Sequence, residues 1–515
     1  MGELEAFLKI HRAKAPYRDA EKRRHDYEEI LGVLPEHVLA EQGARCMDCG
    51  VPFCHNGCPL GNLIPDWNDL VYRGDWREAI AALHATNNFP ELTGRICPAP
   101  CESACVLDIN DDPVTIKSIE HAIAERAFDE GWIVPDVPAP ELRTGRSVAV
   151  VGAGPAGMAA AAELNLLGHH VVVYERDEGV GGLMRFGVPD AKLDKAIIDR
   201  RVAILEAEGV EFRCGVDVGV DLEIGALRES HDAVVIAIGA REGREMTVSG
   251  RGLRGVHMAM DYLYQRNRAV ARMYGRAAPP EPGSDDLITA ASKRVLVIGG
   301  GDTGMDCISN AVREGAVSAE ILDVYPELDQ LTGRDARHPW PLAPRRTLNT
   351  YALEEGGERV WSTEVTELLD DSTGAVAGVR GRKVMGTSSA DLEPVPGSEF
   401  EQPAELVLLA IGFTGVERAG FVERLGVELD RRGNIADRSY RTSMENVFVA
   451  GDARMGATLI VHAIAEGRRC ARVVDSALAP DARRAPVPVA AAGADGPEAT
   501  DPAEDGDAPP DGVLA

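Results

Sequence analysis

Seven of the ten cysteines in this 515-residue chain lie in one short stretch, with a spacing typical of metal ligation. Thiolates this close in sequence hold iron–sulfur clusters, whereas a disulfide framework belongs to short secreted domains. Zinc is the alternative, but zinc sites usually pair two Cys-x2-Cys motifs, and here that pattern does not repeat. The sequence therefore predicts iron–sulfur ligands at Cys46, Cys49, Cys54, Cys58, Cys97, Cys101 and Cys105.

Two 4Fe–4S clusters need more ligands than these cysteines supply, because each cluster is held by four. If two clusters are present, one ligand must come from another kind of residue. Cys214, Cys307 and Cys470 stand singly in strand or helix contexts, and we interpret them as small buried residues.

A glycine motif of the form G-x-G-x-x-G begins at Gly152, directly after an apolar run. Its first glycine permits a tight turn, its second lets backbone approach a pyrophosphate, and its third lets a helix pack on a strand. Glu175 ends the next apolar run, where an acid that binds a ribose is expected. We predict a dinucleotide site at Gly152, Gly154, Pro155, Ala156, Gly157 and Glu175.

Two further segments favour FAD in this first site. Residues 179–190 supply glycines against which a flavin can lie, and residues 446–471 read as a strand, a Gly-Asp turn and a helix start. The aspartate of that turn is placed to accept hydrogen bonds from a ribityl chain, although a helix-capping role is the alternative. The candidate contacts are Gly182, Leu183, Gly451, Asp452 and Thr458.

A second glycine motif spans residues 299–304 and predicts nicotinamide contacts at Gly300, Gly301, Asp302 and Thr303. Two dinucleotide units in one chain imply hydride transfer between NAD(P)H and FAD. NADPH needs an arginine near the end of the second strand, where it holds the 2′-phosphate. The candidates are Arg334, Arg337, Arg345 and Arg346, and the residues alone leave the choice between NADH and NADPH open.

Both motifs require strand–helix–strand units, which the apolar patterns of residues 147–175 and 294–325 predict. Apolar runs at 232–240 and 404–413 resemble each other and predict crossings between the two units. The predicted fold is α/β, with two Rossmann-like nucleotide-binding domains (FAD and NADPH) preceded by an α-helical iron–sulfur domain.

Composition divides the chain further. Prolines at 135, 138 and 140 predict a linker, residues 277–286 predict a surface loop, and the last residues are rich in proline and aspartate without aromatics. We expect a helical iron–sulfur domain over 1–140, an FAD-binding domain over 141–250 and 413–480, an NADPH-binding domain over 251–412, and a disordered acidic tail over 481–515.

The net charge of −29 argues against a nucleic-acid partner, which would need a basic face, and against anionic membrane surfaces. No apolar run approaches the roughly 18 residues of a membrane span. The N-terminus lacks the apolar core of a signal peptide. We therefore expect a cytoplasmic protein.

The motifs occur in an order that resembles one family. GARCMDCGVPFCHNGCPLGN, TGRICPAPCESAC, VGAGPAG, GGLMRFGVPD, GGGDTGMDC and AGDARMGATLIVHAI follow one another along the chain. This series closely resembles the small (beta) subunit of bacterial NADPH-dependent glutamate synthase, and it is similar to the N-terminal half of dihydropyrimidine dehydrogenase. The resemblance covers residues 1–480.

The resemblance implies that NADPH reduces FAD and that electrons then pass through two 4Fe–4S clusters to the FMN of a large (alpha) subunit. That subunit makes L-glutamate from L-glutamine and 2-oxoglutarate, so the resemblance implies a hetero-oligomer. The alternatives are a flavin/iron–sulfur reductase that feeds a ferredoxin or another enzyme, and a non-enzymatic zinc protein. Many relatives carry arginines after the second NADPH strand, where this chain has Val324, Tyr325 and Pro326.

The resemblance also implies the missing cluster ligand. In dihydropyrimidine dehydrogenase a glutamine after the last cysteine fills this role, and alignment of residues 113–120 on that segment gives Glu120, with His121 as a weaker candidate. We expect Cys46, Cys49 and Cys54 to share one cluster with Glu120. The second cluster would then be held by Cys58, Cys97, Cys101 and Cys105.

Overall fold

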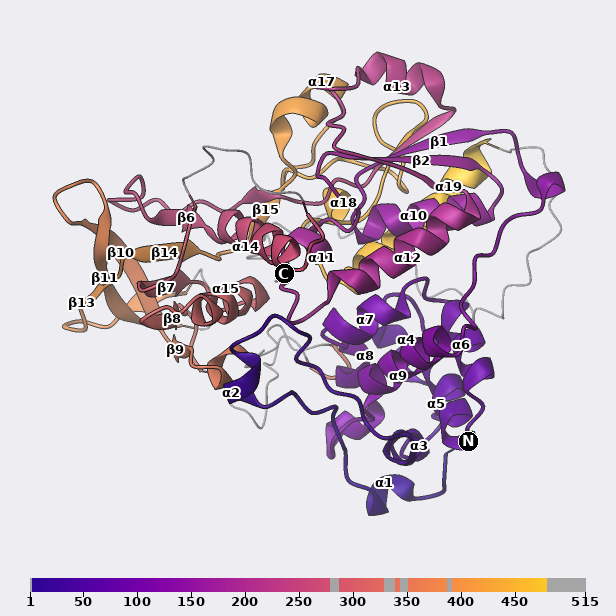
Figure 1. Cartoon of the computed structure of the whole chain (residues 1–515), viewed down its shortest axis with the longest axis horizontal. Helices are drawn as coiled ribbons and strands as arrows, with labels where there is room; N and C mark the ends of the chain where they lie inside the picture. The colour runs from indigo at the N-terminus through magenta and orange to yellow at the C-terminus, as the bar shows by residue number, and fades with distance from the viewer. Residues whose placement is uncertain (1, 278–286, 328–338, 343–350, 387–390, 479–515) are drawn as a thin grey trace.

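The computed structural model describes residues 2–277, 287–327, 339–342, 351–386 and 391–478 (Figure 1). Its elements form a helical N-terminal part and two α/β units, and the helical part packs against the first of these units. The predicted acidic tail, nearly all of the predicted loop at 277–286, and the candidate arginines 334, 337, 345 and 346 lie outside the described residues.

The N-terminal part is made of short helices joined by the loops that carry the cysteines. The helix α9 forms its centre, because Ile116, Ile119, Ile123 and Ala127 recur at helical spacing and are all buried. The elements are α1 (Ala6–Lys9), α2 (Ala20–Arg23), α3 (Glu36–Ala44), α4 (Phe53–Gly57), α5 (Ile64–Arg73), α6 (Trp76–His84), α7 (Pro90–Ile96), α8 (Pro100–Ser103), the 3-10 turn η1 (Val106–Ile109), α9 (Ile116–Asp129) and the 3-10 turn η2 (Pro140–Leu142).

The first α/β unit is a parallel five-stranded sheet in the order β16-β4-β1-β2-β3. Its central strands are continuous apolar runs because helices cover both faces. The strands are β1 (Ser147–Val151), β2 (His170–Glu175), β3 (Glu211–Cys214), β4 (Ala233–Ile236) and β16 (Val447–Val449). The helical elements are α10 (Pro155–Leu166), α11 (Leu183–Phe186), α12 (Lys195–Glu208), α13 (Ile224–Ser230), the π-turn η3 (Arg418–Val422), α17 (Glu423–Leu425), α18 (Asp452–Met455) and α19 (Ile460–Leu478).

The second unit repeats this plan in the order β6-β14-β7-β8-β9, again all parallel. Its strands are β6 (Val256–Met258), β7 (Arg294–Ile298), β8 (Ser318–Leu322), β9 (Glu358–Val360) and β14 (Leu406–Leu409), and its helices are α14 (Ala259–Met273), α15 (Asp302–Arg313) and α16 (Tyr351–Glu354). The two predicted strand–helix–strand units are therefore both present. The two strands predicted as crossings, β4 and β14, lie in different sheets, and the segments that follow them pair with each other as β5 (Glu242–Gly243) and β15 (Phe413–Gly415).

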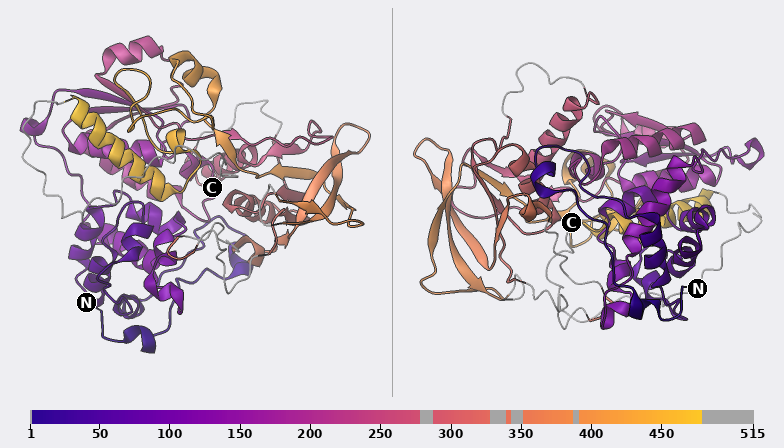
Figure 2. Two further views of the ribbon diagram at one scale, coloured as in Figure 1. Left: turned by 180° about the vertical axis from the view of Figure 1, so that it is seen from behind. Right: turned by 60° about the horizontal axis from the view of Figure 1, so that its bottom comes forward.

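An antiparallel sheet extends the second unit on the side away from the helical part (Figure 2). It contains β10 (Thr363–Asp370), β11 (Val376–Met385), β12 (Glu393–Pro394) and β13 (Phe400–Pro403). No pattern in the sequence predicted this sheet. It stands apart from the glycine motifs and positions none of the predicted site residues.

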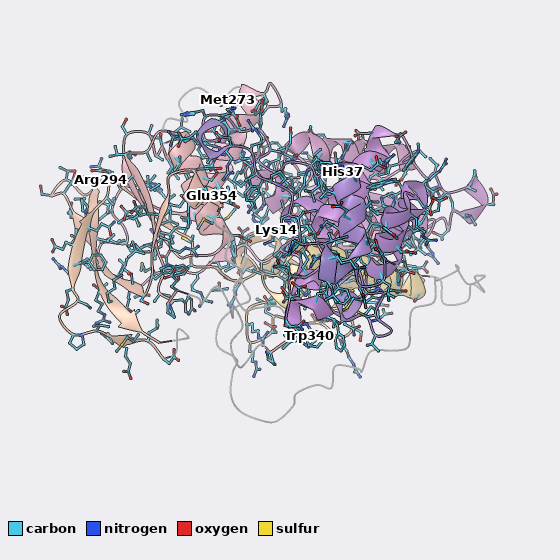
Figure 3. The ribbon with its side chains drawn as sticks, turned by 90° about the horizontal axis from the view of Figure 1, so that it is seen from below. Lys14, His37, Met273, Arg294, Trp340 and Glu354 are labelled. Atoms are coloured by element: carbon cyan, nitrogen blue, oxygen red, sulfur yellow. The ribbon has the colours of Figure 1, made fainter. Side chains whose placement is uncertain are left out.

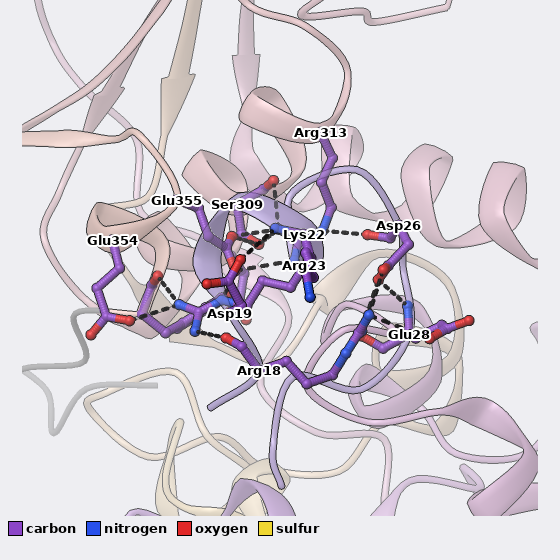
Figure 4. Close-up of polar contacts among 12 residues, drawn as sticks. Arg18, Asp19, Lys22, Arg23, Asp26, Glu28, Ser309, Arg313, Glu354 and Glu355 are labelled. Carbon is purple, nitrogen blue, oxygen red and sulfur yellow. Dashed lines mark hydrogen bonds and ion pairs between the residues drawn. The ribbon is translucent and has the colours of Figure 1, made fainter. Parts of the chain in front are cut away.

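The N-terminal segment also reaches the second unit, where Arg23 anchors it (Figure 4). The Arg23 side chain is 1% exposed, and it donates to Glu355 Oε1 at 2.7 Å and to Glu354 Oε2 at 2.9 Å. Arg313 of α15 donates to the Asp26 carbonyl and also pairs with Glu355. Because a buried ion pair is costly when one partner is lost, these contacts tie the helical part to the second unit.

Candidate redox site

One cavity of about 300 Å³ lies between the two α/β units and the helical part. Residues of both glycine motifs line it, as do residues from the start of α19. Eleven of the predicted dinucleotide contacts border this cavity: Gly152, Gly154, Pro155, Ala156, Glu175, Gly182, Leu183, Asp302, Thr303, Asp452 and Thr458.

Three of the remaining predicted glycines, Gly157, Gly300 and Gly451, face protein. A Cβ at Gly157 would lie 1.9 Å from the Gly152 carbonyl oxygen, so this glycine lets α10 pack on the turn after β1. A Cβ at Gly451 would lie 2.6 Å from Ala156 Cβ, and one at Gly300 would lie 2.0 Å from Asp323 Oδ2. Gly301 caps the N-terminus of α15 beside this cavity.

The first glycine turn is fixed by Glu175 at the end of β2. Its Oε2 accepts a hydrogen bond from the Ala153 backbone N–H at 2.7 Å, and its Oε1 accepts one from Asp177 at 2.9 Å. Burial raises the pKa of Glu175 above its usual value. The carboxylate thus lies at the wall of the cavity beside the turn, where an adenosine ribose binds in Rossmann-like units.

Asp452 begins α18 and is held by Thr458. Its Oδ1 accepts hydrogen bonds from the Thr458 hydroxyl at 2.5 Å and from the Thr458 backbone N–H at 3.2 Å. Burial raises the pKa of Asp452 to about 6. The carboxylate and the N-terminus of α19 therefore border the same part of the cavity.

The second glycine turn has an acid in the same place as the first. Asp323 directly follows β8, is buried, and accepts a hydrogen bond from the Tyr325 N–H. Arg359 of β9 donates to the Gly300 carbonyl oxygen at 2.7 Å, which brings a guanidinium to this turn. Neither residue was predicted from the sequence. The position of Asp323, directly after the second strand of its unit, corresponds to that of Glu175 and could have predicted it.

Most other residues that line the cavity were also not predicted, and four of them bear on the chemistry. Ile96 and Pro98 come from the helical part and flank Cys97, while Lys192 precedes α12 and Asp306 lies in α15. No local motif marks these positions, because they reach the cavity only through the packing of separate units.

The seven clustered cysteines fall into two groups. Cys46, Cys49, Cys54 and Cys105 line one hollow in the helical part. Trp340, which is labelled in Figure 3, packs beside this hollow. Its indole N–H donates to the Cys105 carbonyl oxygen at 3.2 Å, and the centre of its ring lies 4.7 Å from that of Phe53. Burial raises the pKa of Cys46 to about 11.

Cys58, Cys97 and Cys101 form the second group, and Glu120 of α9 lies with them. Burial is the largest cause of the raised pKa of each thiol, and the Glu120 charge raises all three further. Glu120 Oε1 accepts a hydrogen bond from Asn87 Nδ2 at 3.0 Å and another from the Thr93 hydroxyl. Burial raises the pKa of Glu120 itself to about 7.

The predicted partition of the cysteines is therefore wrong, because the structure groups the same residues differently. Glu120 lies with Cys58, Cys97 and Cys101, and Cys105 lies with Cys46, Cys49 and Cys54. Cys101 lies within the short helix α8, and Cys105 lies after the end of this helix, next to η1, so the two thiols face different groups. The weaker candidate His121 packs against Gly94 instead, with Arg95 as its nearest charged influence.

The donor sets fit iron–sulfur chemistry. Four thiols surround one hollow, and three thiols and a carboxylate form the second group. Buried thiols with raised pKa values need a cationic centre to become thiolates, and a metal cluster provides one. The lining of the cavity also suits dinucleotide binding, since glycine backbone and helix N-termini border it.

Comparison with known families agrees with this division. Residues 23–132 match the family model described as dihydropyrimidine dehydrogenase domain II, 4Fe–4S cluster. Residues 146–467 match the pyridine nucleotide-disulphide oxidoreductase family. The predicted order of an iron–sulfur domain followed by a nucleotide-binding oxidoreductase is confirmed.

Relatives that match nearly the whole chain decide the family. The glutamate synthase small chain (NADPH) of Mycobacterium tuberculosis H37Rv is 49% identical over 92% of this chain and 96% of its own length. The chain belongs to the glutamate synthase small-chain family. The small chain (NADPH) of Bacillus subtilis is 41% identical over 92% of this chain and 98% of its own, and the longer glutamate synthase (NADH) of Schizosaccharomyces pombe is 42% identical over 92% of this chain and 23% of its own.

Solved structures support the predicted α/β fold of this small chain. FprA from Mycobacterium tuberculosis superposes with a TM-score of 0.52 at 20% identity, covering 65% of this chain and 86% of that one. Family membership confirms the predicted resemblance and the oxidoreductase class. Within the described residues, no helix combines the length and apolar character needed to cross a membrane.

The conformation of Gly154 gives a test of the first dinucleotide site. Its φ of −72° is open to any residue, and a Cβ would meet nothing within 4 Å in the protein. We expect Gly154→Val to fold normally and to contain little flavin, because only a bound pyrophosphate would occupy that space. Flavin absorbance per protein and thermal unfolding measure the two effects.

Gly301→Val is the matched control, because Gly301 occupies the position in the second unit that Gly154 occupies in the first and has a similar φ of −78°. This variant should keep its flavin and show a raised KM for NADPH. Wild-type flavin content in Gly154→Val would contradict the assignment.

Proposed function

We propose that this chain is the electron-input subunit of a glutamate synthase. It oxidises NADPH at FAD and passes the electrons through 4Fe–4S clusters to a large subunit. The observation that carries the proposal is the single cavity bordered by both dinucleotide units and by Ile96 and Pro98, the neighbours of Cys97. When bound, FAD accepts hydride from NADPH and releases electrons one at a time.

The first α/β unit binds FAD in this proposal. Glu175 holds the adenosine ribose, the turn at Gly152, Gly154, Pro155, Ala156 and Gly157 approaches the pyrophosphate, and Asp452 with Thr458 faces the ribityl chain. Gly182 supports the turn, since a Cβ on it would lie 2.9 Å from Gly154 Cα. Leu183 and Gly451 complete the contacts from α11 and α18.

The second unit binds NADPH through Gly300, Gly301, Asp302 and Thr303, with the pyrophosphate at the N-terminus of α15. The domain division proposed from sequence, with FAD-binding segments at 141–250 and 413–480 around an NADPH-binding domain at 251–412, is supported by the sheet order. β16 of the last segment joins the first sheet, and β14 joins the second. Arg359 adds a described cation to the sequence candidates for the 2′-phosphate.

Two 4Fe–4S clusters then form the electron path. One cluster is held by Cys58, Cys97, Cys101 and Glu120. It is the inner cluster, because the neighbours of Cys97 border the flavin cavity. The outer cluster is held by Cys46, Cys49, Cys54 and Cys105, whose hollow is bordered by the partly exposed Met47. Electrons enter at the inner cluster and leave from the outer one.

The outer cluster lies beneath an exposed rim that suits a large (alpha) subunit. Met47, Val51 and Ile109 flank the ligands and are 37%, 64% and 56% exposed. Asp48 and Asp111 are exposed in the same segments, so we expect a partner face with an apolar centre and basic surroundings. That partner carries the FMN at which L-glutamate is made from L-glutamine and 2-oxoglutarate.

The role of Glu120 is tested by its removal. Glu120→Ala should leave flavin content and NADPH oxidation by artificial acceptors intact, while one cluster is lost or its reduction potential changes. Iron content and electron paramagnetic resonance of the reduced protein measure this. Glu130→Ala is the control, because this exposed glutamate lies just after the same helix. Two clusters with unchanged signals in Glu120→Ala would remove Glu120 from the ligand set.

The division of labour is tested with the isolated chain. It should oxidise NADPH with ferricyanide or a dye as acceptor and form no glutamate from glutamine and 2-oxoglutarate. Addition of a large subunit should then give glutamine-dependent NADPH oxidation with 2-oxoglutarate. Glutamate formation by the isolated chain would contradict the proposal.

A further inference from the structure

A buried ion pair joins the two α/β units at the cavity. Lys192 Nζ lies 2.9 Å from Asp306 Oδ1, and the Tyr351 hydroxyl donates to the same oxygen at 2.8 Å. The Lys192 side chain is 14% exposed and that of Asp306 is 6% exposed. Lys192 comes from the first unit, and Asp306 and Tyr351 come from the second.

The direction in which the flavin lies along the cavity determines which end of it meets this ion pair. Glu175 and the first glycine turn mark the adenosine end of the cavity, and Asp452 marks the ribityl chain. The redox end of the flavin must then lie beyond Asp452, in the part of the cavity where the first unit meets the second. Lys192 and Asp306 border the cavity together with Asp302 and Thr303 of the nicotinamide site.

Hydride transfer creates a charge in this part of the cavity. A hydride carries two electrons and one proton, so its transfer leaves NADP⁺ and adds one negative charge to the flavin. The side chains of Lys192 and Asp306 are largely buried, and a fixed cation is worth more in such surroundings than in solution. A buried lysine paired with one carboxylate is a weak contribution to stability, since desolvation offsets the attraction.

We propose that the Lys192 ammonium group contacts the redox end of the flavin and stabilises the negative charge that hydride transfer brings there, and that Asp306 and Tyr351 position it. This inference rests on the proposed function. Lys192 acts as an electrostatic group and transfers no proton in the step. The other titratable groups around Lys192 are Asp302 of α15, Tyr17 of the N-terminal segment and Lys117 of α9.

Lys195 provides a matched control within the same segment. It is also a buried lysine, it lies 3.5 Å from Asp190, and it donates to the Val188 and Leu193 carbonyl oxygens at 2.7 and 2.8 Å. Lys195 does not border the cavity. A purely structural role of a buried lysine would therefore appear equally in variants of both residues.

The experiment compares Lys192→Met, Lys192→Arg and Lys195→Met in the full chain with its cofactors. The flavin midpoint potential is measured by anaerobic titration, and flavin reduction by NADPH is followed by stopped-flow absorbance. We expect a more negative potential and a roughly 10²-fold slower reduction in Lys192→Met, the loss typical of removing one group that stabilises developing charge. Lys192→Arg should keep the flavin potential and the rate of flavin reduction close to those of the wild type. Lys195→Met should leave the flavin potential unchanged.

An unchanged potential in a flavin-containing Lys192→Met protein would overturn the inference, as would an equal shift in Lys195→Met. If Lys192→Met does not fold, Lys192→Gln replaces it, because glutamine is neutral and keeps a hydrogen-bond donor. Reduction of the wild-type flavin by NADPH tests the proposed function separately, so the two failures are distinguishable.

Discussion

The structure depends on one constraint: a group that accepts hydride and a group that carries single electrons must lie close to the same cavity. Three parts of the chain that are far apart in sequence border the same cavity. Residues of both glycine turns border it, and Ile96 and Pro98 bring the backbone of Cys97 close to it. The arginine contacts of Arg23 and Arg201 serve this constraint, because each ties the helical part to an α/β unit through buried carboxylates.

The helical part buries its clustered thiols beside the apolar core that surrounds α9. The helices of this part are short, and seven cysteines with raised pKa values lie in or beside the loops between them. Burial opposes ionisation of each thiol, so the ligating thiolates gain their stability from the metal. Assembly of the clusters and folding of this part are therefore coupled. The interleaved pairing of Cys58 with Cys97, and of Cys54 with Cys105, links the two cysteine segments into one body.

Sequence patterns predicted what is local and missed what depends on packing. The strands β1, β2, β7 and β8 and the turns after β1 and β7 follow from apolar runs that end in glycine motifs, and the structure has all of them. The partition of the cysteines depends on how the chain turns after Cys101 at the end of α8, which spacing along the chain does not encode. Lys192 and Asp306 carry no motif and meet only when the two sheets are in place. The antiparallel sheet was not predicted because apolar and polar residues alternate only weakly in its strands, which also contain charged residues.

The central claim is that electrons pass from the cavity to the Cys97 group and only then to the Cys105 group. Anaerobic reduction by NADPH, followed by electron paramagnetic resonance, tests this directly in Cys97→Ala and Cys105→Ala proteins. We predict a reduced flavin and a still oxidised outer cluster in Cys97→Ala. In Cys105→Ala we predict a reduced inner cluster without electron delivery to the large subunit. Full reduction of the outer cluster in Cys97→Ala, at the wild-type rate, would contradict the order.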